Sequence, residues 1–145
     1  MKKLALSVIA ICTIAFANAQ ALNAAKVPNA VKGSCTKHFP DIKNVKWELE
    51  NGQYEASFKK DGHDESAMFK KDGTFTESEV DIKVTELPST VTPYIKEHYK
   101  GTPVKEASKI TKANGEVNYE AAIKGKDVIF DANGKFIKGS KEAKD

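Results

Sequence analysis

The sequence predicts an α+β protein made of two tandem repeats, each a helix followed by a four-stranded antiparallel meander. Three observations predict this class. The chain resembles itself about sixty positions apart. Within each half, the spacing of apolar residues changes from a helical to an alternating pattern. Asn-Gly and Asp-Gly pairs, which favour hairpin turns, separate the alternating stretches. We expect one body with both helices on one face of the sheet, because a unit of about 60 residues is marginal alone.

The first nineteen residues predict a secretory signal peptide. Lys2 and Lys3 precede an apolar run, and the small-x-small motif Ala17-Asn18-Ala19 follows it. This run is shorter than the about 20 apolar residues that a membrane-spanning helix needs. We therefore expect cleavage before Gln20 and an exported chain, periplasmic or extracellular, without a membrane span.

The two predicted repeats, residues 20–84 and residues 85–145, align through their helices. Val31 and Cys35 lie on one helical face of the first repeat, and Val91 and Ile95 take the matching places in the second. Cys35 therefore stands where the other repeat has isoleucine, which predicts a buried structural thiol. The chain's other cysteine falls within the signal peptide, so no disulfide is expected within the mature chain.

Alternating stretches follow each helix and predict the strands. Val45, Trp47 and Leu49 alternate with charged residues, and Asn51-Gly52 turns the chain into a second alternating stretch. Such strands have one apolar face and one polar face. Further strands are expected near residues 65–69 and 75–82 in the first repeat, and near 104–110, 117–123, 127–131 and 135–138 in the second.

The charge pattern argues against nucleic acids and anionic membranes as partners. The formal net charge is +3, and all 23 basic residues are lysines. Arginine is the usual residue for a bidentate grip on phosphate. A nearly balanced chain without arginine is better suited to other partners.

The sequence contains none of the local motifs that signal catalysis. It has no Gly-x-Ser-x-Gly, no paired thiols and no phosphate-binding loop, so we expect no enzyme and no cofactor. His38 and His98 take matching places in the two repeats. They could in principle share a metal ion or a small ligand, although no acid or thiol accompanies them at ligand spacing. Residues 61–65 and 131–134 are interpreted as hairpin turns.

The motifs Val27-Pro28-x-x-Val31, Phe39-Pro40, Val45-x-Trp47 and Tyr54-x-Ala56-x-Phe58 resemble those of the PepSY-like exported domains, also described as β-lactamase-inhibitor-like and typical of Bacteroidetes. A second copy extends from Leu87-Pro88 to Gly134. The resemblance implies a two-copy helix-plus-sheet fold in the periplasm, and a kinship of shape with domains that inhibit or bind other proteins. It supplies no catalytic residues.

The combined hypothesis is an exported, non-catalytic binding or inhibitor-like module, expected to be a monomer, that recognises another envelope protein through its sheet. The alternative is a periplasmic protein that binds a metal or small ligand. No metal-ligating residues are assigned. The expected partner-binding residues lie on the polar side of the strands, where we expect a solvated surface: Lys46, Glu48, Glu55, Ser57, Asn118 and Glu120.

Overall fold

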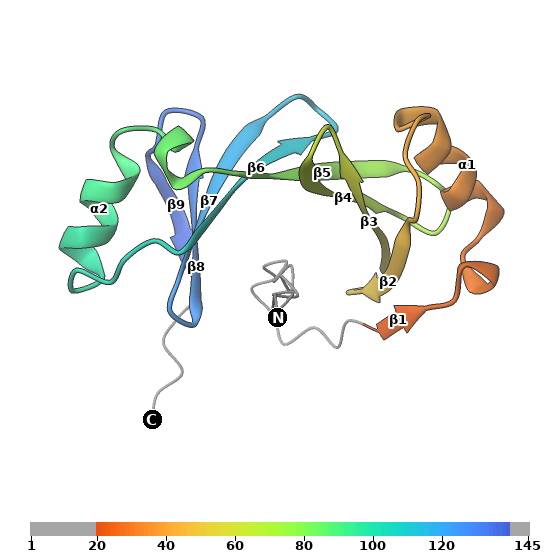
Figure 1. The fold of residues 1–145 in the computed structure, drawn as a ribbon, viewed down its shortest axis with the longest axis horizontal. Coiled ribbons are helices and arrows are strands. Elements are labelled where there is room, and N and C mark those ends of the chain that lie inside the picture. Colours follow the sequence, from red (N-terminus) through yellow and green to blue (C-terminus); the bar gives the residue numbers. More distant parts are fainter. Residues whose placement is uncertain (1–19, 140–145) are drawn as a thin grey trace, which may run out of the picture.

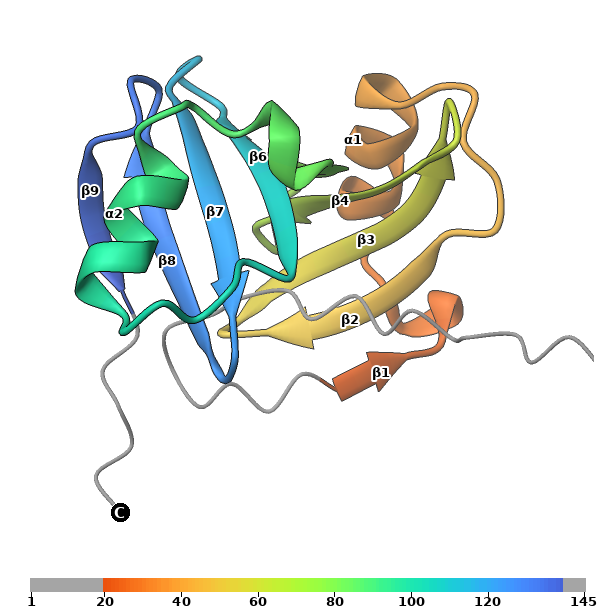
Figure 2. The same ribbon diagram turned by 60° about the vertical axis from the view of Figure 1, so that its left-hand side comes forward.

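A computed structural model describes residues 20–139, which form one antiparallel sheet with two short helices (Figures 1 and 2). The predicted signal peptide, residues 1–19, lies outside the described residues, as do residues 140–145 of the predicted second repeat. Within the described part of the chain, no helix is long and apolar enough to cross a membrane.

The nine strands are neighbours in the sheet in the same order as in the chain, and every neighbouring pair is antiparallel. Their bounds are β1 (Gln20–Leu22), β2 (Lys46–Glu50), β3 (Gln53–Lys60), β4 (His63–Phe69), β5 (Phe75–Ile82), β6 (Glu106–Lys112), β7 (Val117–Ile123), β8 (Lys126–Asp131) and β9 (Phe136–Gly139).

The predicted fold class, α+β with two helix-plus-meander repeats, is wrong because the sheet dominates the fold. The helices α1 (Asn29–His38) and α2 (Val91–His98) have only 10 and 8 residues. Strands β5 and β6 pair from Glu77 opposite Lys112 to Ile82 opposite Ala107, so the strands form one continuous sheet. This pairing satisfies backbone groups that two separate units would each leave at an open edge.

Two kinds of short segment were not anticipated from the alternating pattern. β1 pairs with β2 and adds one strand to the eight that the sequence predicted. Its three residues are too few to show alternation. Single 3-10 turns precede the two helices, η1 (Ala24–Lys26) and η2 (Val84–Glu86). α2 begins at Val91, so Pro93 falls in its first turn, where a missing N–H leaves no helical hydrogen bond unmade.

The apolar residues form two core clusters, one beneath each helix. In the first, Val31 and Cys35 of α1 pack with Ala56, Ala67 and Phe69 of the sheet. Ala56 and Ala67 lie directly opposite each other on β3 and β4. The small alanine side chains leave space beside the helix for its larger side chains.

The second cluster repeats this arrangement beneath α2. Val91 and Ile95 of α2 pack with Phe130 and with Ala107 and Ala121, which are opposite each other on β6 and β7. The two clusters have no member in common. The sheet therefore joins two separate cores.

Two hairpin turns hold the helix starts close to the sheet. Gly73 has a φ of +88°, and a Cβ at this position would lie 2.6 Å from the carbonyl oxygen of Ala30 in α1. Gly134 has a φ of +76°, and its Cβ would overlap the hydroxyl of Thr90, which donates a hydrogen bond of 3.0 Å to the Gly134 carbonyl. Only glycine allows both this backbone conformation and this close approach.

Candidate functional site

Alternate strand positions place many carboxylates on the face of the sheet opposite the two cores. Residues that are directly paired across strands share a face. Starting from Glu48 and Glu55, the pairing continues through Met68 and Glu77 to Lys112. A parallel row runs from Lys46 and Ser57 through Ser66, Glu79 and Ile110 to Asn118. A third row holds Asp81, Ser108, Glu120 and Ile129.

We call this surface the acidic face and define it by Glu48, Glu50, Glu55, Glu77, Glu79, Asp81 and Glu120. Figure 1 shows the sheet arching between α1 and α2, which stand at its two ends. The acidic face lies on the side turned away from both helices, because the opposite strand positions supply the core clusters. It is therefore a broad surface that the helices do not cover.

Several carboxylates of the acidic face are buried, in contrast to the solvated surface expected from the sequence. Glu55 is only 1% exposed, Glu120 is 2% exposed and Glu50 is 3% exposed. Burial disfavours the charged form of a carboxyl group and raises its pKa. The face therefore combines high charge density with low exposure, which is costly unless the charges are compensated.

The pKa values of two of its carboxyl groups reflect this cost. Burial, followed by the charges of Glu50 and Glu48, raises the pKa of Glu55 to about 7, and a hydrogen bond with Ser66 opposes the shift. Burial also raises the pKa of Glu79, against a hydrogen bond with Ser108. Carboxyl groups whose pKa is strongly raised by burial are typical of functional sites as well as of structural networks.

Some buried acceptor atoms on this face lack a hydrogen-bond partner among residues 20–139. They include Oε1 of Glu55 and Oδ1 of Asn118, a residue that is 5% exposed. The amide nitrogen of Asn118 does donate, to Oε1 of Glu116 at 3.2 Å. A buried polar atom without a partner costs about 1–3 kcal/mol, so each such atom calls for an explanation.

The lysines at the margins of the face pair with acids outside its centre. The Nζ of Lys59 lies 2.8 Å from Oδ1 of Asp64, and the Nζ of Lys112 lies 3.0 Å from Oε1 of Glu116. Lys46 is exposed at the β2 end of its row. These lysines leave the two orphaned acceptors without a donor from the described part of the chain.

All six residues that the sequence singled out lie on the same side of the sheet as the carboxylates of the acidic face, but their surroundings differ from the expectation. Glu55, Asn118 and Glu120 are buried, whereas Glu48 and Ser57 are half-buried. The sequence analysis missed four other carboxylates: Glu50, Glu77, Glu79 and Asp81. The last three alternate along β5, and that spacing is the signal that could have identified them.

The structure does not bring His38 and His98 together. His38 stacks on Phe75 with ring centroids 4.7 Å apart, and His98 stacks on Tyr94 at 4.1 Å. Their helices stand at opposite ends of the molecule (Figure 1). Within the range 20–139, no group of three or more His, Cys, Asp or Glu side chains is placed to hold a metal ion.

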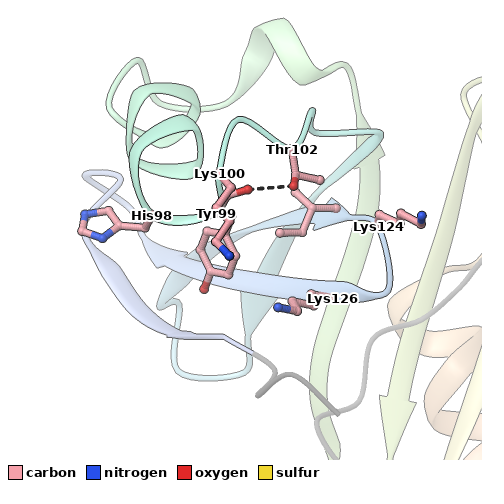
Figure 3. Close-up of a pocket in the computed structure, with 7 residues that line it drawn as sticks. His98, Tyr99, Lys100, Thr102, Lys124 and Lys126 are labelled. Atoms are coloured by element: carbon pink, nitrogen blue, oxygen red, sulfur yellow. Dashed lines mark hydrogen bonds between the residues drawn. The ribbon is translucent and has the colours of Figure 1, made fainter. Parts of the chain in front are cut away.

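A pocket of about 490 Å³ beside α2 is a weaker candidate than the acidic face. Figure 3 shows Tyr99 and Lys126 side by side, with His98 and Lys124 pointing away from each other on its two sides. The Nζ of Lys126 lies 5.7 Å from the centroid of the Tyr99 ring. His98 and Lys124 therefore do not converge on one ligand. The lining residues are His98, Tyr99, Lys100, Thr102, Ile123, Lys124 and Lys126.

Comparisons with solved structures show the same fold in proteins of Bacteroides. A periplasmic protein of B. eggerthii, described as putative, has a TM-score of 0.69 and 16% identity, with 78% of this chain and 87% of that chain covered. A DUF2874 family protein of B. uniformis has a TM-score of 0.69 and 18% identity, with 77% and 87% covered. A BLIP-like protein of B. fragilis has a TM-score of 0.63 and 21% identity, with 77% and 84% covered.

A comparison with curated proteins gave no match. The B. eggerthii neighbour is named as a periplasmic protein, and export of this chain is the expectation from its first nineteen residues. A family model described as "Putative beta-lactamase-inhibitor-like, PepSY-like" matches twice, over residues 15–76 and 52–138, and so covers most of the sequence. The chain belongs to this PepSY-like, beta-lactamase-inhibitor-like family.

Proposed function

We propose that this protein is an exported, non-catalytic module that recognises another protein of the cell envelope through the acidic face. The observation that carries this proposal is the face itself, a broad sheet surface not covered by the helices, with buried acceptors that lack partners within residues 20–139. A protein partner supplies both hydrogen-bond donors and area enough to cover it.

The family and the fold support the same proposal. The family is described as inhibitor-like, and a BLIP-like protein shares the fold. The described residues contribute no metal cluster, and His98 and Lys124 of the pocket in Figure 3 point away from each other. Catalysis by positioned acids and bases requires convergent groups around a reacting atom. We therefore favour recognition over catalysis, and over the metal-binding alternative.

The test is photo-crosslinking in the envelope of the producing organism, with the full chain carrying a bulky substitution on the face. Ser57→Trp places an indole in the middle of the acidic face, beside Lys46 and Ser66. Ser89→Trp is the matched control, at an exposed serine ahead of α2. We expect the Ser89→Trp control to retain the crosslinked partner and the Ser57→Trp variant to lose it. Equal crosslinking by both variants would place the interface elsewhere and overturn the proposal.

A further inference from the structure

We propose that the acidic face binds a segment of the partner that carries several lysine or arginine side chains, with their N–H groups donating to the orphaned acceptors of Glu55 and Asn118. This inference deepens the proposed function and rests on it. It specifies the chemistry of the partner, which neither the family description nor the shared fold supplies.

The first support is the crowding of like charges. Glu48 and Glu55 are directly opposite each other on β2 and β3, and like charges so placed destabilise a sheet. Along β5, Glu77, Glu79 and Asp81 project to the same face at alternate positions. A sheet that carries such a charge pattern gives up stability in the free protein, as functional surfaces commonly do. A cationic partner removes the repulsion when it binds.

The second support is the kind of atom left without a partner in the described chain. The Oε1 of Glu55 and the Oδ1 of Asn118 are both acceptors. The missing groups are therefore donors, and a lysine ammonium offers three N–H donors and an arginine guanidinium five. Asn118 is uncharged, so its orphaned oxygen points to a donor independently of the acidic cluster.

The third support is the spread of these acceptors, which separates a cationic segment from a metal ion. Glu55 lies on β3 and Asn118 on β7, four strand spacings apart, which is about 19 Å along the sheet. A calcium ion is held by oxygens about 2.3–2.6 Å away and cannot reach both. An extended peptide of about six residues spans this distance. The area therefore fits a segment with several cationic side chains.

The test uses hexalysine as the probe and isothermal titration calorimetry with the purified full-length protein at pH 8 and low salt. The first variant is the double substitution Glu55→Gln and Glu79→Gln. Its matched control is Glu86→Gln with Glu97→Gln, which removes the same two charges from exposed sites outside the face. Hexaglutamate serves as the peptide control.

We expect the Glu55/Glu79 double variant to weaken hexalysine binding about tenfold or more, because a hydrogen bond to a charged group is lost at Glu55 and a second negative charge of the face is lost at Glu79. The Glu86/Glu97 control should change it less than about twofold, as exposed ion pairs contribute little. Equal losses in the two double variants would indicate attraction by net charge alone and would overturn the proposal. Displacement of hexalysine from the face by calcium chloride would also overturn the proposal.

A charge-neutral variant keeps the test decisive if the double variant fails to fold. Asn118→Leu removes the orphaned acceptor without altering net charge, and it should weaken hexalysine binding about threefold, on the scale of one neutral hydrogen bond. Unchanged binding in this variant would contradict the role assigned to Asn118. One combination of results separates the two proposals: Ser57→Trp abolishes partner crosslinking, but the glutamine variants keep both hexalysine binding and partner binding. In that case the proposed function is supported and the cationic nature of the partner segment is contradicted.

Discussion

The half with α1 and β1–β5 and the half with α2 and β6–β9 have matching cores. Phe69 and Phe130 are both fully buried, each beneath its own helix. The turns that follow them make the same backbone hydrogen bond. Gly73 N–H donates to the Lys70 carbonyl and Gly134 N–H to the Asp131 carbonyl, both at 2.9 Å. The helices of the two halves therefore pack on the sheet in the same way.

The halves differ on the acidic face. Glu55 faces Glu48 across the strand pair, whereas its counterpart in the Tyr-Glu-Ala motif, Glu120, faces Ser108 and Ile129. Core packing constrains both halves equally, because any misfit there costs stability. The face that makes no core contact is free to differ, and its like-charge crowding is concentrated in β2, β3 and β5. That contrast places most of the like-charge crowding of the proposed binding surface in the half with α1.

The largest effect should come from breaking the matched cores. Phe69→Ala and Phe130→Ala should each lower the free energy of unfolding by about 3–5 kcal/mol, as for other buried aromatic side chains. Because the two residues belong to clusters without a common member, their costs should add in the double variant. Urea denaturation followed by tryptophan fluorescence and by circular dichroism measures both.

Although the two cores are separate, the β5–β6 pairing should make the wild-type protein unfold in a single transition. This strand pair joins the halves through continuous backbone pairing, and small single domains usually unfold cooperatively. Two separate transitions in the wild-type protein would mean that the halves are independent. A core variant that unfolds only one half would lead to the same conclusion. Either result would contradict a single cooperative sheet.

An intermediate effect, of opposite sign, should come from the acidic face. Glu55→Gln should raise the free energy of unfolding at pH 8 by about 1–3 kcal/mol. The reason is the elevated folded-state pKa of about 7 against an ordinary 4.5, a difference that corresponds to about 3 kcal/mol. Glu120→Gln should raise the free energy of unfolding by less than Glu55→Gln does, because no carboxylate lies directly opposite Glu120 on the neighbouring strands β6 and β8.

The pH dependence fixes the sign of this effect. Between about pH 4.5 and 7, the Glu55 carboxyl holds its proton in the folded protein and releases it in the unfolded chain. The folded state then binds more protons, so stability falls as pH rises through this range. Glu55→Gln should remove that part of the slope and leave stability at pH 4.5 nearly unchanged. A variant that is less stable than wild type at pH 8 would contradict the strained charge assigned to Glu55.

The sequence predicted the elements better than their assembly. The alternation around Trp47 and at residues 117–123 identified strands correctly, because each strand's pattern is local. The pairing of β5 with β6 could not be predicted from local alternation, because residues 83–105, with η2 and α2, separate the two strands. Pairing between distant strands depends on the shape of the whole sheet, which local spacing does not encode.

The candidate site was predictable in position and not in character. Alternation placed Glu48, Glu55 and Asn118 on one polar face. Their burial is a property of the folded chain that a short stretch of sequence does not encode, so alternation alone suggested a solvated surface. The alternating acids of β5 were a local signal of the same polar face. Their position at the centre of the sheet follows only from the pairing of β5 with β6.

The smallest effect should come from Cys35, which takes a matched core position where the halves differ in residue type. Cys35 is 2% exposed and Ile95 is 1% exposed, each beneath its own helix. Burial raises the pKa of the Cys35 thiol to about 11, which suppresses the thiolate that reacts with labelling reagents. Labelling by a maleimide should therefore be slow in the native protein and fast in denaturant. Cys35→Ala should cost about 1–2 kcal/mol, and Ile95→Ala more, because the larger side chain leaves the larger cavity. Rapid native labelling would mean that α1 leaves the sheet readily, and it would contradict the buried thiol assigned to the core beneath α1.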